Sequence, residues 1–65
     1  MSQFNSDDRV IISSECKDEQ YRGISGTVLE TKSSSDGLVN RVCLDISVGR
    51  ACVFWFADHE LVRVA

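Results

Sequence analysis

The sequence predicts an all-β domain, folded as a strongly bent five-stranded small barrel. Apolar and polar residues alternate with period two, and turn signals recur at intervals of about 8–12 residues. A chain of 65 residues is too short to fill a two-sheet sandwich, whereas closure of a bent sheet removes exposed edges. We expect residues 1–7 to be a flexible start and residues 8–65 to be a single domain.

The first strand is expected within residues 8–13, where Val10 and Ile12 share one face. A polar and charged segment follows and ends at Gly23. It is interpreted as a long loop, because Tyr21 is the one side chain that would anchor a helix there.

The second strand is expected at residues 24–32, which are rich in β-branched side chains. Gly26 lies inside it and indicates a bulge or a tight bend. Serines followed by Asp36-Gly37 predict a hairpin turn. Alternating apolar residues then predict a half-buried third strand over residues 38–46.

Gly49 marks the next turn, before an apolar fourth strand at residues 50–56. Residues 57–60 are predicted to form one short turn of 3₁₀ helix. A short fifth strand, residues 61–65, completes the pattern.

Composition narrows the classes of function. With 43% hydrophobic residues the chain is expected to fold rather than to stay disordered. Ten acidic residues against seven basic ones give a net charge of -3, which argues against a generally basic nucleic-acid binder. No long apolar run or secretory signal is recognised, so no membrane association and a cytoplasmic location are expected.

Three cysteines, Cys16, Cys43 and Cys52, are too few and too widely spaced for a familiar cysteine motif. An odd number does not close a disulfide framework, and no Cys-x-x-Cys pair indicates a zinc site. We therefore expect free thiols in a core or on a sheet face, with no metal and no other cofactor.

Three segments resemble KOW-type and SH3-like small β-barrel domains. Residues 21–28, Tyr-Arg-Gly-Ile-Ser-Gly-Thr-Val, resemble the KOW pattern of an aromatic followed by Gly-x-x-Gly-x-Val. Residues 8–10 resemble the Gly-Asp-x-Val opening, with Asp7 or Asp8 in place of the glycine, and residues 56–64 resemble the closing strand. The layout is also similar to the small barrel accessory subunit of photosystem I. The resemblance implies a five-stranded SH3-like barrel of the kind found in ribosomal proteins, transcription factors and electron-transfer subunits.

The resemblance also settles the register of the fourth strand, where a slip of one residue would exchange the two faces. It places Phe56 inside and Trp55 outside, and gives Gly23 a positive φ. The expected core consists of Val10, Ile12, Ile24, Val28, Val42, Leu44, Phe54, Phe56, Leu61 and Val64.

No group of residues predicts catalysis. His59 lies in a predicted turn and is interpreted as a solvated side chain. Adjacent carboxylates, such as Asp7 and Asp8, point apart in a loop, whereas acid–base catalysis needs facing groups. The chain is therefore expected not to be an enzyme and to have no catalytic residues.

The favoured hypothesis is a protein-interaction module or accessory subunit that docks on a larger complex. Its contact surface is expected at the long first loop and an aromatic face, because exposed aromatics beside charged residues are typical of interface centres. The predicted contact residues are Tyr21, Arg22, Val53 and Trp55.

Two alternatives stay open. The first is an accessory factor that contacts RNA, the ribosome or RNA polymerase through Arg22, Lys32 and Arg41, because phosphate contacts need clustered cations. The second is a permanent structural subunit of an enzyme or electron-transfer complex. Either a monomer or a dimer paired through strand edges is compatible with these residues.

Overall fold

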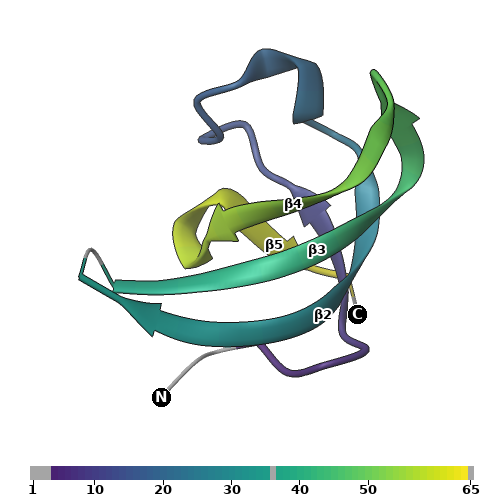
Figure 1. Cartoon of the computed structure of the whole chain (residues 1–65). Coiled ribbons are helices and arrows are strands. Elements are labelled where there is room, and N and C mark those ends of the chain that lie inside the picture. Colours follow the sequence, from purple (N-terminus) through teal and green to yellow (C-terminus); the bar gives the residue numbers. More distant parts are fainter. Residues whose placement is uncertain (1–3, 36, 65) are drawn as a thin grey trace.

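Five antiparallel strands form one curved sheet in the computed structural model, which describes residues 4–35 and 37–64 (Figure 1). Two short 3₁₀ helices, η1 (Glu19–Tyr21) and η2 (Asp58–Glu60), lie in the first loop and directly before the last strand. The all-β class and the 3₁₀ turn before the final strand are thus confirmed. The strands are β1 (Arg9–Ile12), β2 (Ser25–Ser34), β3 (Gly37–Val48), β4 (Ala51–Ala57) and β5 (Leu61–Arg63).

The strand order in the sheet is β4-β3-β2-β1-β5. Strands β4 and β5 are therefore the two edges, and within residues 4–35 and 37–64 they do not pair with each other. The described pairing forms a bent sheet of five strands, and the closure into a barrel that the sequence predicted is not confirmed by it. Ser34 pairs with Gly37 across the predicted hairpin turn, whose Asp36 lies outside the described residues.

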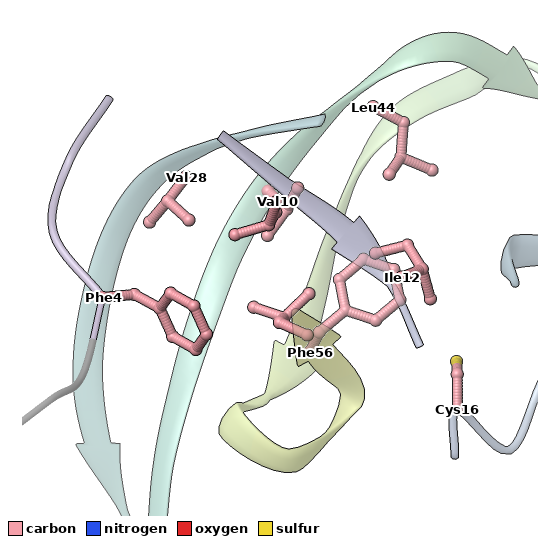
Figure 2. Close-up of a cluster of buried hydrophobic side chains, with 9 residues drawn as sticks. Phe4, Val10, Ile12, Cys16, Val28, Leu44 and Phe56 are labelled. Atoms are coloured by element: carbon pink, nitrogen blue, oxygen red, sulfur yellow. The ribbon is translucent and has the colours of Figure 1, made fainter. Parts of the chain in front are cut away.

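The core lies against the concave side of the curved sheet (Figures 1 and 2). Alternation places Val42 and Leu44 of β3 on this side, as predicted. Phe4 and Cys16, which were not predicted, lie toward opposite ends of the cluster in Figure 2. The buried hydrophobic residues are Phe4, Val10, Ile12, Cys16, Val28, Val42, Leu44, Phe56 and Leu61.

The other predicted core residues are less buried. Ile24 and Phe54 are half-buried and pack against the margin of the cluster. Val64 was predicted inside and is exposed. It is three positions after the buried Leu61, and residues an odd number apart in extended chain point to opposite faces.

The segment before β1 packs on the sheet in its described part. The Phe4 ring is buried, and the Asp7 N–H donates to the Val28 carbonyl at 2.8 Å. Asp7 has a φ of 73°, in the left-handed region where the resemblance places a glycine. Of the segment expected to be a flexible start, residues 1–3 lie outside the described residues, whereas Phe4 and Asp7 both contact the rest of the domain.

Two predicted glycine roles have different outcomes. Gly23 ends the first loop with a φ of 82°, which confirms the positive φ expected there. Gly26 was expected to mark the bulge or bend of β2, but the pairing irregularity falls between Val28 and Glu30. Gly26 instead lies where β2 and β3 approach closely, opposite Leu44.

An ion pair links the first and third strands across β2. The Arg9 guanidinium donates to both Asp45 carboxylate oxygens and to Thr27 Oγ1, the last at 2.8 Å. These hydrogen bonds hold the pKa of Asp45 below its ordinary value and raise the pKa of Arg9. The paired side chains are about half exposed, so solvent screens the attraction.

The lowered pKa of Asp45 predicts an acid-sensitive contribution to stability. A carboxyl with a depressed folded pKa stabilises the fold above its unfolded value, near pH 3.9, and loses this effect as the pH falls through the folded value. Asp45→Asn should therefore lower the urea midpoint modestly at neutral pH. Near pH 2 the difference from the unchanged chain should vanish. A constant difference across this range, or an equal effect of Glu30→Gln at an exposed position, would contradict the assignment.

Candidate protein-interaction site

Strand β4 forms one edge of the sheet and has a single strand neighbour. Its pairing with β3 runs from Val53 opposite Cys43 to Ala57 opposite Val39. No other described strand pairs with its second side. Figure 1 shows β4 between β3 and the first loop, with η2 at its end. An edge of this kind presents backbone N–H and C=O groups to a partner.

Alternation along β4 places its aromatic residues on different faces. Phe56, opposite the buried Asn40, points into the core and is 3% exposed. Trp55, opposite Arg41, lies on the outer face and is 44% exposed. The predicted register of this strand is therefore confirmed.

A cation covers part of the exposed tryptophan. The Lys32 Nζ lies 5.0 Å from the centroid of the Trp55 ring. Lys32 pairs with Val39, two positions from Arg41, so it shares the outer face with Arg41 and Trp55. This cation–π contact orients the indole while leaving a large part of it accessible.

Two adjoining hollows border β4. The larger, about 640 Å³, lies between η2 and the adjoining ends of β3 and β4. The smaller, about 280 Å³, lies between β4 and the first loop. We call the two hollows together the β4 groove. The residues that line both of them are Lys17, Trp55, Phe56 and Glu60.

Tyr21 forms an aromatic wall of the smaller hollow. Its ring centroid lies 4.8 Å from that of Phe54, and it meets the Phe56 ring edge-on at 5.6 Å. Such pairs stabilise each other beyond simple burial. Tyr21 thus anchors η1 on the sheet, and the surface that it offers to a partner is limited because the residue is half-buried.

Arg22 is engaged within the first loop. Its Nε donates to the Cys16 carbonyl at 2.8 Å, and its guanidinium lies 3.7 Å from Glu19. The alternative nucleic-acid set is therefore divided. Lys32 and Arg41 share the outer face of the sheet, whereas the contacts of Arg22 lie in the loop.

Glu60 fixes the rim of the groove. Its carboxylate accepts the Ala57 N–H at 2.9 Å and the Lys17 N–H at 3.5 Å, so it joins η2 to both β4 and the first loop. The lining also includes Asp18 and Asp58. Three carboxylates against one lysine make the groove predominantly acidic.

Of the predicted contact residues, Trp55 and Tyr21 line the groove, and Val53 lies half-buried two positions from Trp55 on the same face. Sequence reasoning expected the charged first loop, which includes Lys17, as the rim of this surface, and it missed Asp58 and Glu60. The acidic turn at residues 57–60 was a usable signal for the last two, because it directly follows the aromatic strand. Their convergence with Lys17 depends on the tertiary fold.

The remaining observations concern the single histidine, metal ligands and membrane-spanning helices. His59 is exposed on η2. Among residues 4–35 and 37–64, no three potential metal ligands cluster. In the same ranges, no helix has the length and apolar character needed to cross a bilayer. Comparisons with protein families, curated proteins and solved structures found no match to this chain.

Proposed function

We propose that this chain is a non-enzymatic protein-interaction module, with a KOW-related, SH3-like small-barrel fold, that docks on a larger complex through the β4 groove. The main support is the half-exposed Trp55 at an unpaired strand edge, flanked by two hollows. The SH3-like assignment draws on the sequence resemblance, the five-strand antiparallel order and the η2 turn before β5.

The proposed occupant is an extended segment of a partner protein. Backbone groups on the open side of β4 can pair with an added strand, and side-chain pockets then provide selectivity. The hollows on either side of Trp55 suit alternate side chains of such a segment. Trp55 supplies the large, partly rigid apolar surface that is enriched at interface centres.

Charge further specifies the partner. Asp18, Asp58 and Glu60 outnumber Lys17 in the groove, and the whole chain carries a net charge of -3. Complementarity therefore favours a segment that alternates apolar residues with lysine or arginine. Binding should weaken moderately as salt rises, because these rim charges are exposed.

The test is a displayed library of ten-residue peptides, selected on the folded chain, with Trp55 emission as the binding signal. Enriched peptides should alternate apolar and basic residues. Trp55→Ala, followed by competition or calorimetry, should weaken their binding by about 2 kcal/mol, roughly 30-fold. Val62→Ala is the matched control, because Val62 is an exposed apolar residue on the other edge strand.

Selected peptides that bind Trp55→Ala as tightly as the unchanged chain would contradict the proposed site. Selection of acidic peptides would contradict its charge assignment. A mobility shift of single-stranded RNA, abolished by Lys32→Gln and Arg41→Gln together, would favour the nucleic-acid alternative, because Trp55 beside two cations could stack a base. Purification in fixed stoichiometry with an enzyme complex would favour the permanent-subunit alternative.

A further inference from the structure

We propose that Cys43 and Cys52 form a redox modification site, in which the two thiols close an intramolecular disulfide by exchange with a small-molecule disulfide. The two sulfur atoms lie 3.8 Å apart on neighbouring strands. Both cysteines are free and half-buried, so a small reagent can reach them. This site is independent of the proposed docking function.

The irregular pairing of β3 and β4 brings these sulfurs together. Val53 is opposite Cys43, so in a continuous ladder the next residue, Cys52, would point to the other face. The regular register ends at Cys43 and resumes where Val48 meets Ala51. Between these two pairs several β3 residues lie opposite Cys52 alone. The Cys52 side chain therefore does not have to follow the alternation of faces along β4.

Closing the bond requires a modest movement. Disulfide sulfurs are about 2.05 Å apart, so the thiols must approach by less than 2 Å from 3.8 Å. Side-chain rotation on half-exposed positions can supply part of this approach. The rest comes from the irregular segment, because it lacks the continuous ladder that would hold β3 and β4 rigidly.

The reaction balances as two thiol–disulfide exchanges. One cysteine thiolate attacks a small disulfide, RSSR, forms a mixed disulfide and releases one RS⁻, which takes up a proton. The second thiolate then attacks the protein sulfur of that mixed disulfide and expels the other RS⁻. The two cysteines lose two electrons and two protons in total, and RSSR is reduced to two RSH.

The third cysteine has a different environment. Cys16 is 2% exposed, and its burial raises the pKa of the thiol, which disfavours the reactive thiolate. Contact with the Cys52 thiol raises the pKa of Cys43, so exchange should be faster at mildly alkaline pH. Cys43 and Cys52 are more exposed than Cys16, and their sulfur atoms are close together. We therefore expect the disulfide to form between Cys43 and Cys52 and not to include Cys16.

Oxidised glutathione is the probe, applied to the folded full chain at mildly alkaline pH. The expected product is a monomer that has lost two hydrogens in mass and retains one titratable thiol. Peptide mapping should identify the link as Cys43 to Cys52. Because a cross-link restricts the unfolded chain, the product should melt several degrees higher and return to the original value on reduction.

Matched variants separate this site from general thiol reactivity. Cys16→Ser should still lose two hydrogens, whereas Cys52→Ser should stop at the mixed disulfide with glutathione on Cys43. Three thiols remaining in the folded chain, a link that includes Cys16, or a disulfide between two chains would each overturn the proposal. Urea-unfolded chain is the reactivity control, because its three thiols should all react.

Discussion

Gly26→Ala is expected to destabilise the fold by about 3 kcal/mol, near the upper part of the range for overpacking. A β-carbon at Gly26 would lie 2.7 Å from the Cys43 carbonyl oxygen and 2.8 Å from Val42 Cγ1. The carbonyl is backbone, so β3 itself would have to move. A domain this small has a total stability of roughly 3–5 kcal/mol, so the variant should retain at most about 2 kcal/mol at 25 °C.

The sign of the change in unfolding free energy distinguishes overpacking at Gly26 from restriction of the unfolded chain. Where space and backbone geometry permit, glycine-to-alanine changes stabilise by about 0.4–1 kcal/mol, because they restrict the unfolded chain. Gly26 has no positive φ, so conformational freedom does not explain the glycine there. Urea unfolding followed by circular dichroism measures the difference, with Glu30→Ala on the exposed part of β2 as control. A variant as stable as the unchanged chain would show that the two strands can separate at little cost.

Asn40→Asp is expected to cost about 3 kcal/mol at neutral pH, because it leaves a buried charge without compensation. The Asn40 amide is fully buried and donates to the Phe56 carbonyl at 3.3 Å and to Asp58 Oδ1 at 2.5 Å. Its oxygen accepts the Thr31 hydroxyl at 3.0 Å. The substitution removes both N–H donors and places a second carboxylate against Asp58.

Acid should partly reverse this loss. Burial and the neighbouring carboxylate both favour the neutral form of the new carboxyl, so its pKa in the folded state is raised. A group with a raised folded pKa is less destabilising at low pH, and the variant should gain stability relative to the unchanged chain as the pH falls. Thr31→Val removes one hydrogen bond and should cost about 1 kcal/mol with no such pH dependence. Equal urea midpoint differences at pH 7 and pH 4.5 for Asn40→Asp would contradict this account.

The strands were predictable where one face is clearly apolar. Val10 and Ile12 in β1, and Val42 and Leu44 in β3, repeat with period two, and all four are buried. The two faces of β4 were ambiguous from periodicity alone, and the resemblance assigned them as the structure has them. The prediction of an outward-facing Trp55 therefore depended on the resemblance and not on the alternation of residues.

The structural features that the sequence did not predict depend on contacts between segments that are distant in the chain. Phe4 and Cys16 lie among polar residues, so no local pattern indicated their burial. Asn40 continues the inward face of β3, but its hydrogen-bond partners come from β2, β4 and η2. The open edge of β4 is likewise a property of the strand order, which alternation within each strand does not determine. For this reason the sequence predicted the anchor of the groove and the first loop beside it, but missed the part of the rim that η2 contributes.

The two ends of the described chain meet on one side of the sheet. The Arg63 guanidinium lies 5.5 Å from the centroid of the Phe4 ring and 3.0 Å from Asp8, and the Val64 N–H donates to the Arg9 carbonyl. The first and last described segments are therefore in direct contact. During synthesis β1 can pair with β2 as soon as β2 has been made, but its second edge stays open until β5 follows at the end of the domain.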